Sequence, residues 1–231
     1  AGVPPDYFSA KGQRWGNPVY RWDVMEREGF DWWLQRLRHG LALFDLVRID
    51  HFRGLVKFWS IPAREDSAEK GEWVDASPGA FLEAVRENFP GLPFIAEDLG
   101  YITPDVTAHI RSLGILGTLV LQFAFGPGFD KSPYAPRNHR ENACVFTGTH
   151  DNNTARGWFK SEATPLAREQ LSALVGGAVT GGDVSLKMVE LALSSRARFA
   201  LYPMQDLLGL GAEARLNTPG KPRGNWLWRV R

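Results

Sequence analysis

Short apolar runs alternate with helical patterns along most of this chain, and this alternation constrains the fold more than any other feature of the sequence. Five runs are too short for helices and are bounded by turn residues or charges, which is typical of buried strands. They cover residues 44–49, 93–96, 116–123, 143–147 and 199–203. Helical patterns cover residues 32–43, 81–88, 104–113, 165–174 and 185–197. The alternation predicts a parallel sheet with helices outside it.

Two of these helices have recognisable starts. Ser77 precedes Pro78 and Thr103 precedes Pro104. An N-cap residue followed by proline at the first helical position is typical of a helix start. We therefore expect helices to begin at these prolines.

Polar side chains follow four of the five expected strands. They are Asp50 and His51, Glu97 and Asp98, Thr149 to Asp151, and Gln205 and Asp206. The carboxyl ends of parallel strands open onto the βα loops of an α/β barrel, where active sites lie. A doubly wound sheet also gathers ligands at strand ends, but the sequence has no GxGxxG or phosphate-loop motif. The pattern therefore favours an α/β barrel with a site at these strand ends.

The first 27 residues are rich in glycine, proline and aromatic residues, so they cannot form a long helix. Long ordered loops in compact domains often bind ligands or cover sites. We expect residues 1–231 to form one catalytic domain. In this domain, residues 1–27 are an active-site loop region and residues 28–231 carry the strand and helix repeats.

Composition excludes several classes of partner. The net charge of +1 points to neither a nucleic acid nor an anionic membrane surface. The single cysteine, Cys144, allows no intrachain disulfide, and we expect it to be a buried thiol. No apolar stretch reaches the ~18 residues of a membrane helix, and residues 1–6 lack a signal-peptide pattern. We expect a cytoplasmic protein.

Nine tryptophans are a high count. Tryptophan and tyrosine stack on flat, amphipathic ligands such as sugar rings. We expect most of the nine to pack in the core, and those in polar, glycine-rich loops to be candidates for sugar binding.

Arg48 and Asp50 lie two residues apart at the end of the first expected strand. Residues i and i+2 of a strand share a face, so the two side chains point the same way. The guanidinium favours the ionised form of Asp50, which a nucleophile requires. A purely structural ion pair is the alternative.

Glu97 ends the second expected strand. Partial burial there would raise its pKa, as a proton donor near neutral pH requires. Retaining glycoside chemistry needs such a donor beside an attacking carboxylate. The alternative is that Glu97 or Asp98 caps the following turn.

His150 and Asp151 follow the fourth expected strand, within a run of hydroxyl and amide residues. This composition suits the hydroxyls of a sugar. It is equally compatible with metal ligation or with a plain network of loop hydrogen bonds.

Eight stretches together carry a specific resemblance to a known family. They are PPDYFS (4–9), GQRWGNP (12–18), VRIDHFRG (47–54), IAEDLG (95–100), LQFAF (121–125), THDN (149–152), NTPG (217–220) and NWLWR (225–229). The chain resembles the 4-α-glucanotransferases of the amylomaltase and disproportionating-enzyme type, relatives of the α-amylase clan. The resemblance implies a TIM-type (β/α)8 barrel, of which this chain holds about five C-terminal strands with their helices.

The resemblance also implies transfer of α-1,4-glucan segments by retaining double displacement, without cofactor or metal. Asp50 would be the nucleophile, Glu97 the acid/base, and Asp151 the third catalytic carboxylate, which binds hydroxyls of the reacting glucose. The implied substrate-binding residues are Arg48, His51, His150, Trp15, Gln13, Tyr7, Phe8 and Phe123. Donors and acceptors would be maltooligosaccharide, starch or glycogen chains.

Three departures from the family pattern accompany the resemblance. The family barrel has eight strands, so we expect its first three strands and its final helix to lie outside this chain. A second chain or segment would then complete the barrel. Asn153 stands where relatives have Asp, and residues 126–128 are glycine and proline where relatives are more acidic.

Three alternative functions compete with this interpretation. A metal-dependent hydrolase could use Asp50, His51, Glu97, Asp98, His150 and Asp151 as ligands, although no HxH or HExxH spacing is present. A non-catalytic glucan-binding fragment would bind maltooligosaccharide without turning it over. An ordinary α-amylase-type hydrolase would release reducing ends.

Overall fold

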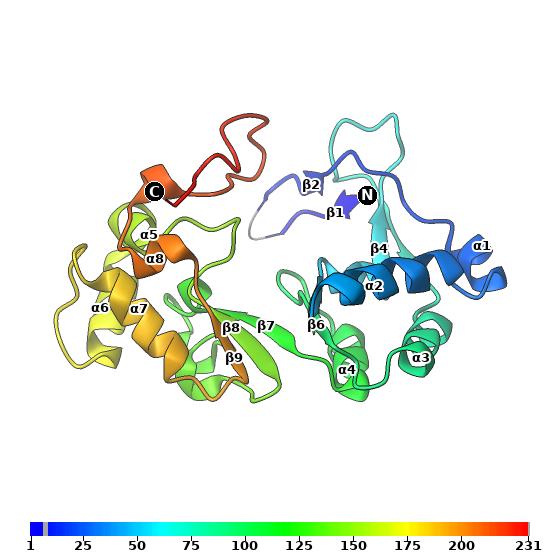
Figure 1. Ribbon diagram of the computed structural model, residues 1–231. Helices are drawn as coiled ribbons and strands as arrows, with labels where there is room; N and C mark the ends of the chain where they lie inside the picture. Colours follow the sequence, from blue (N-terminus) through cyan, green and yellow to red (C-terminus); the bar gives the residue numbers. More distant parts are fainter. Residues whose placement is uncertain (7–8, 231) are drawn as a thin grey trace. The chain divides into compact units, whose positions relative to one another are not determined.

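The computed structural model describes residues 1–6 and 9–230 (Figure 1). The chain divides into two compact units, Ala1–Gly117 and Thr118–Arg231. Each unit has its own cluster of buried apolar side chains, so each is described by itself.

The first unit contains two parallel strands, β3 (Val47–Ile49) and β6 (Phe94–Ala96). Ile49 pairs with Ala96, so the two strands end in register. Ile95 also forms a parallel bridge to Leu116, and the Ala96 N–H donates to the Leu116 carbonyl at 2.7 Å. Asp50 and Glu97 therefore leave neighbouring strands at the same level.

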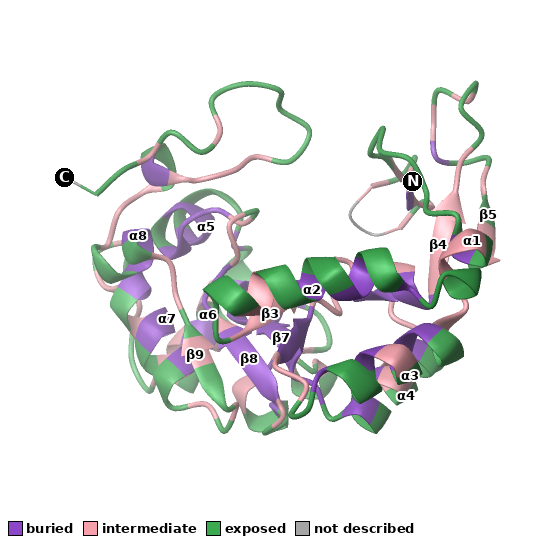
Figure 2. Ribbon diagram, turned by 45° about the vertical axis from the view of Figure 1, so that its right-hand side comes forward, coloured by how far each residue is buried: buried purple, intermediate pink, exposed green. Residues whose placement is uncertain are grey.

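Three helices of this unit were predicted from their apolar spacing. They are α2 (Asp31–Leu43), α3 (Pro78–Asn88) and α4 (Pro104–Leu113). In Figure 2, α2 presents exposed residues along one side and buried ones along the other, and its buried residues are Trp33, Leu34 and Leu37. The face that carries them packs into the core of the unit together with Phe81 of α3.

The prolines at the starts of α3 and α4 are confirmed, but neither preceding residue caps its helix with its side chain. Ser77 adopts a left-handed backbone conformation, with φ of 47°. The Thr103 hydroxyl instead accepts a hydrogen bond from Arg53 at 2.9 Å. A tertiary contact has thus taken the place of the local cap.

A four-stranded antiparallel sheet and one helix of the first unit were not predicted. The sheet has the order β2-β1-β4-β5. Its strands are β1 (Gly2–Val3), β2 (Gln13–Arg14), β4 (Lys57–Ser60) and β5 (Glu72–Asp75). The short helix α1 spans Trp22–Arg27. The segment 1–27 is therefore a loop region that also holds two short strands and this helix.

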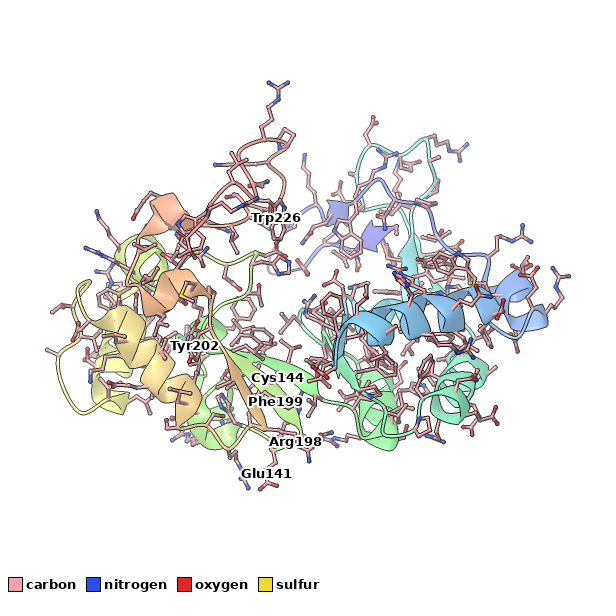
Figure 3. All side chains as sticks on the ribbon, viewed as in Figure 1. Glu141, Cys144, Arg198, Phe199, Tyr202 and Trp226 are labelled. Carbon is pink, nitrogen blue, oxygen red and sulfur yellow. The ribbon has the colours of Figure 1, made fainter. Side chains whose placement is uncertain are left out.

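The second unit contains a three-stranded sheet of order β7-β8-β9. The strands are β7 (Gly117–Val120), which begins at the last residue of the first unit, β8 (Ala143–Phe146) and β9 (Phe199–Leu201). β8 and β9 are parallel, with Cys144 opposite Phe199 (Figure 3). Cys144 is fully buried, as predicted, and burial raises the pKa of its thiol to about 11.

Four helices belong to this unit: α5 (Ala155–Ser161), α6 (Pro165–Leu174), α7 (Val184–Leu193) and α8 (Met204–Leu207). In Figure 1, α6 and α7 lie beside each other on one side of the β8–β9 pair. The Thr154 and Thr164 hydroxyls accept from the Gly157 and Ala167 N–H groups, which caps α5 and α6.

All five expected strands exist, and each is shorter than predicted. β7 ends at Val120, and the chain turns into a 3-10 helix, η2 (Leu121–Phe123). Helix α7 ends at Leu193, four residues before the predicted end at 197. There the Ser195 hydroxyl contacts Nδ1 of the buried His139 at 2.7 Å and accepts from the Ala197 N–H at 3.0 Å. These bonds turn the chain toward β9.

The tryptophans are less often buried than we expected. Trp22, Trp33 and Trp158 are buried, whereas Trp15, Trp32 and Trp226 are exposed. Among the described residues, no helix combines the length and apolar character that crossing a membrane requires.

Candidate active site

Asp50 and Arg48 form an ion pair at the end of β3, with Nη1 of Arg48 2.7 Å from Oδ1 of Asp50. The shared face that strand periodicity predicts is therefore confirmed. The Asp50 side chain is 76% exposed, and that of Arg48 is 27% exposed. The carboxylate is thus held on one side and open to a ligand on the other.

Glu97, at the end of β6, is held by two backbone N–H groups. The His51 N–H donates to Oε2 at 2.8 Å, and the Leu99 N–H donates to Oε1 at 2.8 Å. Burial raises the pKa of the Glu97 carboxyl, and the charge of Asp50 acts in the same direction. The two N–H donors and Arg48 oppose this rise. The raised pKa predicted from the sequence is confirmed, and the carboxyl also stabilises the adjoining turns.

His51 directly follows Asp50, and its N–H bonds to the Glu97 carboxyl. Its backbone is left-handed, with φ of 46°, and the following residues form the 3-10 helix η1 (Phe52–Leu55). Burial lowers the pKa of its imidazole to about 4, although Asp50 opposes this shift. His51 is therefore a neutral ring at neutral pH. A Cβ on Gly54 would lie 3.0 Å from its Cδ2, so glycine at position 54 lets the ring pack closely.

Trp15 and Gln13 reach the same place from the N-terminal loop region. The Trp15 ring meets the His51 ring edge-on, with centroids 4.8 Å apart. Its indole N–H donates to the Gln13 side chain at 3.0 Å. The structure thus brings these two predicted substrate-binding residues beside His51, while Tyr7 and Phe8 lie outside the described residues.

Arg53 joins the two loops that follow Asp50 and Glu97. It is buried, and Nη1 donates to the Tyr101 carbonyl at 3.0 Å as well as to the Thr103 hydroxyl. Its guanidinium carbon lies 3.9 Å from the centroid of Trp73 in β5, a short cation–π contact. Arg53 therefore ties the strand-end loops to the antiparallel sheet.

In the second unit, His150 and Asp151 lie on a tight turn after β8. The Asn152 side chain accepts from the Thr149 N–H and from the Thr149 hydroxyl, both at 2.8 Å. The Asp151 N–H points to the same hydroxyl at 3.3 Å. These local bonds fix the turn and leave the Asp151 side chain 48% exposed.

Two residues from the C-terminal segment hold Asp151. Nη2 of Arg215 donates to its carbonyl at 2.6 Å, and the Asn217 amide donates to Oδ1 at 2.5 Å. Arg215 also pairs with Glu162 of the α5 C-cap at 3.7 Å. Asn217 belongs to the NTPG stretch that resembles the family, which implied no role for it, and no pattern in the sequence pointed to Arg215.

His150 lies near both Asp151 and Trp226. Its Nε2 is 3.5 Å from Oδ2 of Asp151, and its ring centroid is 5.3 Å from that of Trp226. Trp226, labelled in Figure 3, is 52% exposed on the C-terminal segment. Sequence reasoning did not select it, although an exposed tryptophan in a polar loop was the expected signal.

Phe123 and Asn153 are two further residues of the second unit that the sequence analysis singled out. Phe123 ends η2, and its ring meets that of Tyr134 edge-on at 5.6 Å. The Asn153 side-chain amide donates to Glu162 at 2.7 Å, and the Asn153 backbone carbonyl accepts from Gln122 at 2.9 Å. Asn153, one of the departures from the family pattern, is therefore a buried structural residue.

The donor set does not favour a metal centre. Within the described ranges 1–6 and 9–230, no three His, Cys, Asp or Glu side chains are arranged to hold a metal ion. What the strand ends do present is an Asp paired with Arg and a half-buried Glu with a raised pKa. Such strand-end carboxyl groups in a parallel α/β fold are typical of the class of enzymes that act on glycosidic bonds with two carboxyl groups.

Comparison with known proteins identifies the family within that class. The chain belongs to the 4-alpha-glucanotransferase family, whose sequence profile matches residues 1–231. The 4-alpha-glucanotransferase of Thermus thermophilus is 49% identical over 236 residues, covering 100% of this chain and 47% of that protein. That of Aquifex aeolicus is 46% identical over 232 residues, with coverages of 100% and 47%. The chloroplastic/amyloplastic DPE1 of Arabidopsis thaliana is 44% identical over 232 residues, with coverages of 100% and 39%.

Solved structures agree with this assignment. An amylomaltase from Streptococcus agalactiae in complex with acarbose matches with a TM-score of 0.94 at 34% identity, covering 100% of this chain and 46% of that chain. The amylomaltase of Corynebacterium glutamicum, with a TM-score of 0.75 at 20% identity over 97% of this chain and 37% of that chain, shows a common fold. The predicted class, part of a TIM-type (β/α)8 barrel, is confirmed. The chain spans about half the length of the relatives that it matches.

Proposed function

We propose that this chain carries the catalytic carboxylates of a 4-α-glucanotransferase, which transfers α-1,4-glucan segments between maltooligosaccharide, starch or glycogen chains. The observation that carries the proposal is the pair formed by Asp50 and Glu97 on neighbouring, in-register strands. Asp50 is paired with Arg48, and Glu97 is half-buried with a raised pKa. These are the two environments that retaining glycosyl transfer requires.

In this mechanism Asp50 attacks the anomeric carbon of the donor, while Glu97 protonates the oxygen of the leaving chain. The sugar–oxygen bond breaks as the bond to the Asp50 carboxylate forms. Glu97, now ionised, then removes the proton from the hydroxyl of an acceptor chain, and the acceptor oxygen displaces Asp50. The two displacements together retain the configuration of the anomeric carbon. This mechanism requires the carboxyl groups of Asp50 and Glu97 to lie about 5–5.5 Å apart.

The other side chains have roles in binding. We assign Asp151 and His150 of the second unit, and Arg48 and His51 of the first unit, to hydrogen bonding with glucose hydroxyl groups of the substrate. Trp15 and Phe123 stack on flanking glucose units. Tyr7, Phe8 and Gln13 contribute from the N-terminal loop region, and no metal or cofactor takes part.

We further propose that residues 1–231 act as one domain, completed by a second segment or chain. Within the described part of the chain, β3 pairs only with β6, and β9 pairs only with β8. Apolar side chains are exposed at or just before these two edge strands: Leu43, Phe44, Phe199 and Leu201. Unpaired strand edges beside exposed apolar residues favour association with another strand.

We also propose a cytoplasmic location, which cell fractionation with an antibody to the chain tests.

The first test is incubation with maltotriose, with the products separated by length. We expect glucose together with maltooligosaccharides longer than the substrate. The Glu97→Gln substitution removes the proton donor, so the rate should fall by on the order of 10²–10⁴-fold. The matched control is Glu87→Gln, the same change on the exposed face of α3, which should leave the rate unchanged.

The product pattern separates this proposal from its alternatives. Release of glucose and maltose without longer products indicates a hydrolase. Intact maltotriose that nevertheless binds, as measured by calorimetry, indicates a glucan-binding fragment. Activity that Glu97→Gln leaves at the wild-type rate contradicts the assignment of the acid/base.

A further inference from the structure

Asp206 of α8 is a completely buried carboxyl group that the proposed mechanism does not use. Its Oδ2 accepts a hydrogen bond from the Thr147 hydroxyl at 2.6 Å. Its Oδ1 accepts a hydrogen bond from the Ala155 N–H at 2.7 Å. Both partners are themselves fully buried. One side chain therefore joins two points of the chain that lie more than fifty residues before it.

Those two points are the ends of one loop. Thr147 directly follows β8, and Ala155 is the first residue of α5. The residues between them, 148–154, form the turn that carries His150 and Asp151. A single carboxyl group thus sets the distance between the two ends of this turn, and it satisfies one of the free N–H groups at the start of α5.

Gln122 makes a second set of contacts with the same loop. The Gln122 amide donates to the Asn153 carbonyl at 2.9 Å. A Cβ on Gly148 would lie 2.6 Å from the Gln122 amide nitrogen, so the loop packs directly on this side chain. The loop is therefore held at its base by buried groups, while its tip carries the exposed Asp151 carboxylate.

Burying a carboxyl group is costly when no cation accompanies it. Among the described residues, Asp206 forms no ion pair with Lys, Arg or His, and burial raises its pKa while the two hydrogen bonds oppose the rise. An apolar side chain of similar size would pack there without this cost. The hydrogen bonds to the loop are what the carboxyl group provides in return.

We propose that Asp206 is a positioning residue, which holds both ends of the loop 148–154 and thereby places His150 and Asp151 for the transferase reaction. This inference rests on the function proposed above. Asp206 does not touch the substrate, and it acts only through Thr147 and Ala155.

The test compares Asp206→Ala, which removes both hydrogen bonds, with Asp206→Asn. The asparagine can accept from the Ala155 N–H through its oxygen and donate to the Thr147 hydroxyl through its nitrogen. Thr147→Val removes one of the two bonds with little change of shape. Thr164→Val is the matched control, because it removes the cap of α6 in the same unit without touching the loop.

Two measurements are made on each variant. Amide hydrogen exchange of residues 148–155 is recorded without substrate. The kcat and KM for maltotriose are recorded separately. For Asp206→Ala we expect exchange in this loop to rise on the order of tenfold or more, since bonds to a carboxylate are among the stronger hydrogen bonds. We expect kcat to fall by a similar factor with KM less affected, because contacts to the reacting sugar strengthen in the transition state.

Asp206→Asn should bring loop exchange and kcat most of the way back to the wild-type values. Thr147→Val should give intermediate loop exchange and kcat. Thr164→Val should match the wild type in both. Loop exchange that Asp206→Ala does not change, or an asparagine variant as impaired as the alanine variant, overturns the proposal. If the alanine variant does not fold, the exchange rate of Thr147→Val decides. A wild-type chain without transfer activity contradicts the proposed function, while the exchange measurement still decides the role of Asp206.

Discussion

At residue 51 the backbone adopts a left-handed conformation, which is uncommon for a residue with a side chain. This conformation directs the His51 N–H to the Glu97 carboxyl and places the half-buried imidazole against Trp15. Backbone strain of this kind persists only where surrounding contacts stabilise it, and it is concentrated at functional sites. His51 therefore links the turn after Asp50 to Glu97, the two residues to which we assign the roles of nucleophile and acid/base.

The lowered pKa of His51, about 4, makes the stability of the chain depend on pH. Below pH 6.5 the His51 imidazole becomes protonated in the unfolded chain but stays neutral in the folded chain. The free energy of unfolding therefore falls as the pH drops toward 4. The loss amounts to at most about 3 kcal/mol. His51→Asn, which tolerates the same backbone conformation, should flatten this dependence, as measured by urea unfolding at pH 7, 6 and 5.

The control for this prediction is His39→Asn on the exposed face of α2. It should unfold with the same pH dependence as the wild type. A His51→Asn variant whose stability falls as steeply as that of the wild type between pH 6.5 and 4 would show that the imidazole is protonated in the folded chain.

At the scale of elements, the loops after β3 and β6 are joined through Arg53 to the antiparallel sheet. Arg53→Met preserves apolar contact with Trp73 but removes the bonds to the Tyr101 carbonyl and the Thr103 hydroxyl. Loss of charged hydrogen bonds at a buried site should lower the free energy of unfolding by about 2 kcal/mol or more. It should also increase hydrogen exchange at the Leu99 N–H, which donates to Glu97.

Arg38→Met supplies the comparison for Arg53→Met. Arg38 also lies over an aromatic ring, Phe89, at 6.0 Å, but it is exposed on α2. Exposed contacts of this kind contribute at most about 1 kcal/mol. Equal losses in the free energy of unfolding for the two variants would show that the burial of Arg53 does not increase its contribution to stability.

The elements that sequence predicted are those whose pattern is local. Helices α4 and α6 have the predicted bounds, because a proline fixes each start and apolar spacing marks the buried face. The strands β1 and β2 have two residues each, which is too short for any periodicity to be seen. They exist because they pair with each other and β1 pairs with β4, and such distant pairing leaves no local signal.

The same distinction applies to the site. The ion pair between Arg48 and Asp50 follows from strand geometry over two residues. The contact between Asp151 and Asn217 joins residues that are 66 positions apart, so a family motif was the only sign of it. Asp206 stood at a strand end like the candidate catalytic residues, but only the structure shows that it faces buried loop ends.

At the scale of the whole molecule, the chain matches 47% of the Thermus thermophilus relative, and β3 and β9 each lie at the edge of a sheet in its described part. The exposed Leu43 and Phe44, just before β3, are 63% and 64% accessible. Apolar side chains this exposed beside an unpaired strand favour docking of another segment. The part of the Thermus thermophilus relative that lies outside the match is the natural candidate for that segment.

We therefore predict that this segment, expressed separately and added to the chain, increases the rate of maltotriose transfer in a saturable manner. Phe44→Glu should weaken this activation at least tenfold, because it places a charge on the docking edge. Since Phe44 is exposed, the same substitution should change the free energy of unfolding of the isolated chain by only about 0.5 kcal/mol. Glu26→Gln, a change at an exposed position of α1 away from β3, should leave activation unchanged. If the segment does not alter the transfer rate, or Phe44→Glu responds to it like the wild type, then this edge of β3 is not where the segment binds.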